Sequence, residues 1–323
     1  SRANCIAQVD AEKCAACGRC VETCPANAIK LGQNLCTKEP IVYQPKPLPD
    51  DHNWGPDRYN PDFRDNYENT HKSGAAPCKS TCPAHISVQG YIKLAALGKY
   101  KEALELIKKE NPFPAVCGRI CPHNCESECT RGHLDEPVAI DDIKRFIADL
   151  ELQEENRFIP EKLFDYSDKK IAIIGAGPAG LSCAFYLAIK GYTITVFEKE
   201  EKLGGMLTLG IPSYRLEKNV VEAEIDVLKQ MGVTFKTGVE VGKDITIPQL
   251  REEGYNGFFL AIGAQGGRKL NIDGADHKDV IAGVDFLRDV NLGKSVSTPG
   301  QVVVIGGGNV AIDVARTATR TGA

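Results

Sequence analysis

Residues 169–200, "KKIAIIGAGPAGLSCAFYLAIKGYTITVFEKE", constrain the fold more than any other segment of the chain. The β-branched run "IAII" predicts a buried strand, and Gly175, Gly177 and Gly180 open a helix after it. Gly191 ends that helix, and "TITVF" predicts a second strand beside the first. A strand, a crossover helix and a strand predict an α/β domain built on a parallel sheet.

The same glycine spacing predicts a dinucleotide site. Gly175 makes the turn, Gly177 lets the backbone approach a pyrophosphate, and Gly180 lets helix and strand pack closely. The helix N-terminus offers free N–H groups and the positive end of its dipole to the phosphates. Glu198, 18 residues after Gly180, can accept hydrogen bonds from ribose hydroxyls. GxGxxG alone is a weak signal, but the complete strand–helix–strand context with the acid makes it strong.

A second motif, "VVVIGGGNVAIDVAR", repeats the logic near the end of the chain. We expect a strand over 302–305, then a helix, with Gly306, Gly308, Asn309 and Ala311 at a nicotinamide site. Asp313 and Arg316 in that helix could equally be solvated or packing residues. The residues that distinguish NADP from NAD follow the next strand, which the sequence does not reach. We therefore expect the chain to be an incomplete view of a longer polypeptide.

Thirteen cysteines are the informative count, and twelve of them precede residue 130. They form tight CxxC and CxxxC groups rather than the dispersed pattern of a short secreted disulfide scaffold. This grouping favours thiolates that hold metal in a reducing compartment, so we expect a cytoplasmic protein.

The first group is "CAACGRCVETCP", the C-x2-C-x2-C-x3-C-P run of bacterial ferredoxins, with Cys14, Cys17, Cys20 and Cys24. It predicts a [4Fe–4S] cluster and makes zinc or chance the weaker readings. In two-cluster ferredoxins the fourth cysteine binds the other cluster, yet only one such run is present. The fourth ligand is therefore open between Cys24, Cys5 and Cys36, and a second half could lie upstream of Ser1.

The second group has six cysteines at four-residue steps. They occur in "PCKSTCPAHI" and "PFPAVCGRICPHNCESECTRG" and are Cys78, Cys82, Cys117, Cys121, Cys125 and Cys129. Iron–sulfur ligation is favoured over a tetrahedral zinc site and over a set of buried free thiols.

The run from "APCKSTCPAHI" to "NCESEC", followed by "GAGPAG" and "GGMLTLGIPSYRL", resembles the small subunit of NADPH-dependent glutamate synthase. It is also similar to the N-terminal part of dihydropyrimidine dehydrogenase and to the large subunit of electron-bifurcating ferredoxin:NADP oxidoreductases. The resemblance covers residues 77–323 and implies a helical iron–sulfur domain, an FAD domain and an NAD(P)H domain.

Two departures from this family bear on the number of clusters. The CxxC that relatives carry upstream of Cys78 is absent from "NTHKSGAAP", and Lys144 stands where a Gln or Glu ligand is expected. The resemblance then implies one cluster on Cys82, Cys121, Cys125 and Cys129. A second cluster in this region, with Cys78 and Cys117 as possible ligands, stays open.

The resemblance also assigns FAD rather than NAD to the first glycine motif. Gly204, Gly205 and Met206 would pass close to the flavin, Arg215 would reach its phosphates or ring edge, and "FFLAIGAQ" would cross it at Gly263. The full set of candidate FAD-binding residues is Gly175, Ala176, Gly177, Pro178, Ala179, Gly180, Glu198, Lys199, Gly204, Gly205, Met206, Arg215, Val241 and Gly263.

The expected fold is multidomain. It comprises a ferredoxin-like α+β unit, an extended linker with six prolines, an all-α iron–sulfur domain, a Rossmann-like FAD domain and the start of a second Rossmann-like domain for NAD(P)H. The corresponding ranges are 1–36, 37–76, 77–165, 166–298 and 299–323.

The expected function is electron transfer between NAD(P)H, FAD and [4Fe–4S] clusters, because one chain joins a two-electron carrier to one-electron carriers. Two clusters are expected and a third is open. The partner would be another redox subunit or ferredoxin, in a larger complex for which electron bifurcation is one option. The alternatives are electron supply to a glutamate synthase and a non-catalytic wiring or docking subunit.

Composition excludes other classes of function. The net charge is −4 and there is no basic tail, so nucleic acid is not an expected partner. The sequence has no apolar run of 18 residues, so no membrane span is predicted. The six histidines lack a catalytic context, and hydride transfer to a flavin needs no side-chain nucleophile, so no catalytic residue is predicted.

Overall fold

The computed structural model describes residues 76–267 and 271–323. The predicted ferredoxin-like unit with Cys14, Cys17, Cys20 and Cys24 lies outside the described residues, and so does all of the predicted linker 37–76 except its last residue. Within the described part, the chain divides into two compact units, 76–110 with 123–140 and 111–122 with 141–323.

The first unit is helical, as predicted for this region. Its elements are α2 (Pro77–Thr81), α3 (Val88–Ala96), α4 (Tyr100–Lys108), α6 (Asn124–Ser127) and the 3-10 turn η2 (Thr130–His133). The periodic stretch 88–110 forms two helices because Gly98, at φ +72°, turns the chain between α3 and α4. The hydroxyl of Tyr91, buried in α3, donates to the carbonyl of Ile140 at 2.9 Å.

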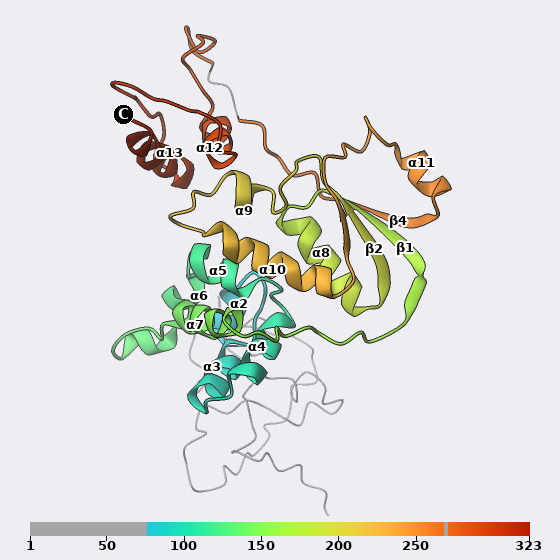
Figure 1. Cartoon of the computed structure of the whole chain (residues 1–323). Helices are drawn as coiled ribbons and strands as arrows, with labels where there is room; N and C mark the ends of the chain where they lie inside the picture. Colours follow the sequence, from blue (N-terminus) through green and yellow to red (C-terminus); the bar gives the residue numbers. More distant parts are fainter. Residues whose placement is uncertain (1–75, 268–270) are drawn as a thin grey trace, which may run out of the picture. The chain divides into compact units, whose positions relative to one another are not determined.

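The second unit contains a four-stranded parallel sheet in the order β3-β2-β1-β4 (Figure 1). The strands are β1 (Tyr166–Ile174), β2 (Tyr192–Phe197), β3 (Thr234–Lys236) and β4 (Tyr255–Leu260). Strand β1 lies in the middle, with Ile173 paired to Val196 of β2 and to Phe259 of β4. This arrangement confirms the two strands predicted on either side of the first glycine motif.

Helices carry the remaining motifs of this unit. They are α5 (Pro114–Ile120), α7 (Ile140–Leu152, assigned to this unit from Asp141), α8 (Pro178–Ile189), α9 (Met206–Leu209), α10 (Lys218–Gln230), α11 (Ile247–Glu252), α12 (Gly283–Asn291) and α13 (Asn309–Arg320). One apolar core joins α5, α8 and α10 to β1 and β2, through residues such as Val116, Phe185, Ile225 and Ile173. The two glycine-motif helices, α8 and α13, both form where the sequence predicts them.

The strand predicted over 302–305 is wrong for the described structure. Residues 301–307 carry no assigned strand, and Val303 and Ile305 are 80% and 71% exposed. A strand exists only through hydrogen bonds to a neighbouring strand, and the described residues supply none to this segment. The predicted domain boundaries stay predictions.

Candidate functional site: a dinucleotide turn and two sets of cysteines

The first glycine motif forms a tight turn between β1 and α8. Gly175 has φ +104°, and a Cβ there would lie 2.3 Å from the carbonyl oxygen of Ala261. A Cβ on Gly180 would lie 1.9 Å from the carbonyl oxygen of Gly175. Both positions therefore require glycine: the first for its backbone angle and both for the close approach of neighbouring backbone.

Gly177 faces open space at the N-terminus of α8. A Cβ on Gly177 would meet nothing nearer than the Cα of Gly205, at 4.0 Å. The segment with Gly204 and Gly205 packs against the turn, because the N–H of Gly204 donates to the carbonyl of Ala176 at 3.0 Å. The turn, the helix N-terminus and the free space over Gly177 fit a pyrophosphate.

Glu198 follows β2 and contacts this turn. Its carboxylate accepts from the N–H of Ala176 at 2.7 Å and from the N–H of Glu200 at 3.0 Å, and the residue is 6% exposed. The acid thus lies at the carboxyl end of the strand beside the glycine turn, where ribose binds in dinucleotide folds. The predicted ribose contact itself stays a prediction.

The other candidate flavin residues belong to several elements of this unit and differ in backbone conformation and exposure. Gly204 and Gly205 have φ +106° and +53°, and Met206 begins α9. Lys199 is exposed, Gly263 follows β4 with φ +69°, and Val241 packs beside Phe197 and Leu250.

Arg215 is engaged with the second glycine-motif helix. Its guanidinium donates to Asp313 of α13 at 2.6 Å, and the hydroxyl of Tyr214 donates to the carbonyl of Asp313 at 3.3 Å. The guanidinium carbons of Arg316 and Arg320 lie 4.4 Å and 4.2 Å from the centre of the Tyr214 ring. Sequence reasoning left Asp313 without a role, and no local pattern links it to a residue about a hundred positions earlier.

Lys218 contacts the loop that follows Gly204 and Gly205, and no sequence pattern predicts this role. Its ammonium donates to the carbonyl of Leu207 at 3.1 Å and to that of Ile211, so it holds the chain in place after Gly205. Burial, with a smaller effect of nearby Lys202, lowers the pKa of Lys218 to about 8.

The second glycine motif has its helix, α13, but no strand precedes it over 301–307. Gly306 has φ +130°, Gly308 precedes α13 as its N-cap, and Asn309 begins the helix. A Cβ on Gly308 would meet nothing within 4 Å, in contrast to the crowded Gly180.

Four of the six described cluster-candidate cysteines lie in the first unit. Cys78 is in α2, Cys82 caps its C-terminal end, Cys125 is in α6, and Cys129 precedes η2. Helices α2 and α6 pack together. Burial raises the pKa of the Cys78 thiol, and the neighbouring Cys129 and Cys82 add to the rise.

Cys117 and Cys121 belong to the second unit, in α5 and at its C-terminal end. The thiol of Cys117 donates to Oδ1 of Asn111 at 3.5 Å. Burial raises the pKa of Cys117, and the charge of Lys144 opposes the rise. Lys144 is itself buried and forms an ion pair with Asp141. The position where the family resemblance expects a Gln or Glu ligand is therefore occupied by a cation.

All six of these thiols are partly buried and none forms a disulfide, which fits the soft thiolate ligands of an iron–sulfur cluster. Among the described residues, no three His, Cys, Asp or Glu side chains are gathered closely enough to hold a metal ion. In the same part of the chain, no helix has the length and apolar character to cross a bilayer.

Three segments of the chain match known families. Residues 7–30 match a 4Fe–4S binding domain, residues 69–156 match the dihydropyrimidine dehydrogenase domain II 4Fe–4S family, and residues 169–323 match pyridine nucleotide–disulphide oxidoreductases. The first glycine turn lies in the segment that matches pyridine nucleotide–disulphide oxidoreductases, and the two cysteine groups lie in the two segments that match 4Fe–4S domains.

Individual proteins are similar to most of this chain. The chain is 42% identical over 271 residues to the beta subunit of NADP(+)-dependent formate dehydrogenase of Moorella thermoacetica, covering 77% of this chain and 38% of that protein. It is 39% identical over 248 residues to the PreT subunit of NAD-dependent dihydropyrimidine dehydrogenase of Escherichia coli, covering 75% and 58%. It is 41% identical over 258 residues to the glutamate synthase [NADPH] small chain of Halomonas elongata, covering 76% and 54%. These relatives confirm the resemblance, and the chain spans less than two thirds of the length of each.

Proposed function

We propose that this chain is part of an NAD(P)H-dependent flavin and iron–sulfur oxidoreductase that passes electrons to or from a partner subunit or ferredoxin. The observation that carries the proposal is the first glycine turn, whose backbone is closed on Gly175 and Gly180 but open over Gly177, with Glu198 beside it. The matched 4Fe–4S segments support a one-electron path in the same chain.

The chain's own residues divide the binding work. The N-terminus of α8 and the Gly177 backbone would hold the pyrophosphate of FAD, and Glu198 would accept from its ribose hydroxyls. The thiolates of Cys82, Cys121, Cys125 and Cys129 would hold one cluster, and Cys14, Cys17, Cys20 and Cys24 a second. When bound, FAD exchanges a hydride with nicotinamide and single electrons with iron–sulfur clusters.

The nicotinamide would bind at the second glycine motif. Gly306, Gly308, Asn309 and Ala311 lie at the N-terminus of α13, where a phosphate would meet free N–H groups. NADPH is supported over NADH by two of the three relatives described above, whose names carry NADP(+) or NADPH.

A larger complex is the setting that we favour. The ferredoxin-like segment 7–30 precedes the part shared with the glutamate synthase small chain, which favours a subunit that exchanges electrons with further redox carriers. A small subunit that supplies a glutamate synthase is the second candidate, and the similarity to that chain supports it. The tight CxxC and CxxxC grouping of the cysteines supports a reducing, cytoplasmic setting.

Anaerobic purification followed by flavin and iron counts tests the proposal. We expect bound FAD and at least about four irons per chain, the content of one cubane cluster. Titration with NADH and with NADPH, followed by EPR, should then show reduced clusters. Absence of FAD, or fewer irons than one cluster needs, would overturn the proposal, and clusters reduced only by an artificial donor would favour the wiring subunit.

A further inference from the structure

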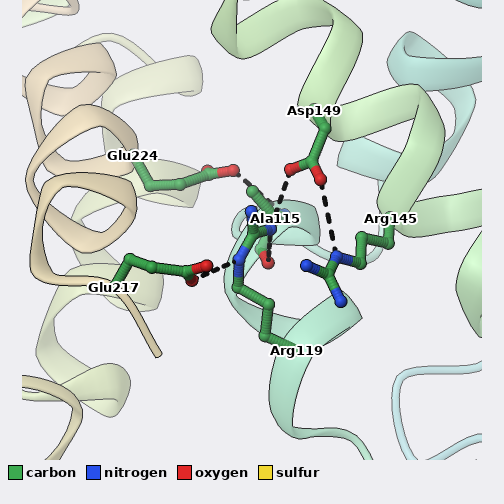
Figure 2. A network of polar contacts seen from close by, with 6 residues as sticks. All are labelled: Ala115, Arg119, Arg145, Asp149, Glu217 and Glu224. Atoms are coloured by element: carbon green, nitrogen blue, oxygen red, sulfur yellow. Dashed lines mark hydrogen bonds and ion pairs between the residues drawn. The ribbon is translucent and has the colours of Figure 1, made fainter. Parts of the chain in front are cut away.

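Helix α5 carries two candidate cluster thiols, Cys117 and Cys121, and Arg119 lies between them in the sequence. The Arg119 side chain is 8% exposed, and its Nε donates to Glu217 at 2.7 Å (Figure 2). Its Nη1 donates to Asp149 of α7 at 2.8 Å and to the carbonyl of Ala115 at 3.1 Å. One guanidinium thus ties α5 to the start of α10 and to α7.

A second contact joins the other end of α5 to α10. The N–H of Ala115, in the first turn of α5, donates to Oε1 of Glu224 at 3.1 Å, and Glu224 is 2% exposed. The first N–H groups of a helix have no partner within it, so this buried carboxylate satisfies one of them. Helix α5 is therefore hydrogen-bonded to the α10 region near both of its ends.

These contacts fix an orientation that apolar packing alone leaves adjustable. Gly118 lies so close to α7 that a Cβ there would be 2.7 Å from Cβ of Arg145. Burial opposes the charge of Arg119, but its hydrogen bonds to Asp149 and Glu217 raise the pKa overall, so the guanidinium stays charged. Charge-assisted hydrogen bonds are short and directional, which restricts α5 to one rotation and one register.

Helix α10 in turn packs on α8, the helix that begins at the first glycine turn. A continuous series of packed elements therefore runs from the Cys121 end of α5, through α10 and α8, to the dinucleotide turn. Arg119 lies at the polar junction of this series, between the candidate cluster ligands and the candidate flavin site.

We propose that Arg119 is a positioning residue for electron transfer: through Glu217 and Asp149 it holds the Cys121 end of α5 at a fixed distance from the flavin. This inference rests on the proposed function. When bound, the flavin would supply single electrons, and the thiolate of Cys121 would be one of the ligands that hold the cluster receiving them. The rate of electron transfer falls as the distance between the two carriers grows, so a displaced α5 would slow this step.

Stopped-flow reduction of the anaerobic holoprotein by NADPH, or by NADH if that is the donor found, tests this role. Flavin and cluster reduction are followed separately in wild type, Arg119→Met and Arg119→Lys. For Arg119→Met we expect an unchanged rate of flavin reduction and a slower reduction of the cluster. Arg119→Lys keeps the charge but cannot bond both carboxylates as the guanidinium does, so it should recover only part of the rate.

Arg145→Met is the matched control. Arg145 contacts the same Asp149, at 3.4 Å, but has no bond to Glu217, so its loss should leave both rates unchanged. The magnetic coupling between flavin radical and reduced cluster, read from EPR relaxation, should weaken in Arg119→Met and not in Arg145→Met. If Arg119→Met loses its cofactors, Glu217→Gln removes one charge from the junction and decides the question by the same measurements.

Unchanged cluster reduction and coupling in Arg119→Met, or equal losses in Arg145→Met, would overturn the positioning role while leaving the proposed function intact. A wild-type holoprotein in which nicotinamide does not reduce the flavin, or the reduced flavin does not reduce a cluster, would overturn both.

Discussion

The two glycine motifs, 175–180 and 306–311, have similar sequences but different structures. Strand β1 before the first motif lies between β2 and β4, and Ile173 in it is 0% exposed. The corresponding segment before the second motif has no strand, and most of the surface of Val303 and Ile305 is open to solvent. The helices that follow, α8 and α13, have the same length.

This difference separates the structure that a motif forms by itself from the structure that needs a neighbouring segment. A helix satisfies its own backbone through i→i−4 hydrogen bonds, so "NVAIDVARTATR" can form α13 from local sequence. A strand depends on neighbours for its backbone hydrogen bonds and for the burial of its side chains. The pattern "VVVI" thus encodes a strand only when other strands lie beside it, as they do for "IAII".

Truncating one strand side chain before each motif should give the largest contrast. Ile173→Ala removes buried methylenes from the core and should cost about 2–5 kcal/mol in the free energy of unfolding. Val303→Ala acts on a side chain already in water and should change it by less than about 0.5 kcal/mol. Chemical denaturation of the two variants and wild type measures both effects; similar losses would mean that 302–305 is as buried as β1.

Adding a methyl group to one glycine in each motif should give the next contrast. Gly180→Ala forces its Cβ against the carbonyl oxygen of Gly175, and backbone displacement should cost about 1–3 kcal/mol. We expect the purified Gly180→Ala variant to lose most of its flavin. The control is Gly308→Ala, whose Cβ has free space, and its flavin content should equal that of wild type. Equal flavin in both variants would contradict the assignment of flavin to the first motif.

Glu198→Gln tests the acid that belongs to the first motif. The amide keeps one acceptor for the N–H of Ala176 but loses the charge, and hydrogen bonds to charged groups contribute about 1.5–3 kcal/mol. Flavin affinity should fall about tenfold in equilibrium dialysis. Glu222→Gln makes the same change at an exposed position of α10 and serves as the control; an unchanged affinity in Glu198→Gln would argue against the ribose contact.

The smallest effect concerns the contact between the two motifs. Asp313→Asn weakens the ion pair with Arg215, whose side chain is 29% exposed, and should cost no more than about 1 kcal/mol. Hydrogen exchange should become faster in α13 and stay unchanged in α8. Lys229→Gln, at an exposed ion pair with Asp226, gives the background level of change. Exchange in α13 that matches this background would show that Arg215 does not hold the helix.

The sequence predicts those parts of the fold that depend on local pattern. The β1–α8–β2 unit, the position of Glu198 and helix α13 follow from hydrophobic spacing and glycine placement. Gly98 breaks the helical stretch 88–110 through its positive φ, which hydrophobic spacing does not report. The strand at 302–305 was predicted in error because periodicity does not show whether a partner strand is present.

The polar contacts between distant segments could not be predicted. Arg119 bonds a residue 98 positions away, and Arg215 bonds Asp313 across a similar separation. A charged residue on a helix gives no sign of whether it meets solvent or a buried partner. The cysteine spacing indicated thiolate ligation, whereas the buried Lys144–Asp141 pair beside Cys117 could be found only from tertiary packing.

Backbone hydrogen exchange of this 323-residue chain tests the central comparison most directly. The account predicts slow exchange for the amides of 171–174, which are bonded within the sheet, and fast exchange for those of 302–305. Amides of α13 should be protected in the same experiment, because the helix forms without the strand. Equal protection of 171–174 and 302–305 would contradict the account, since it would require a strand partner for the second motif.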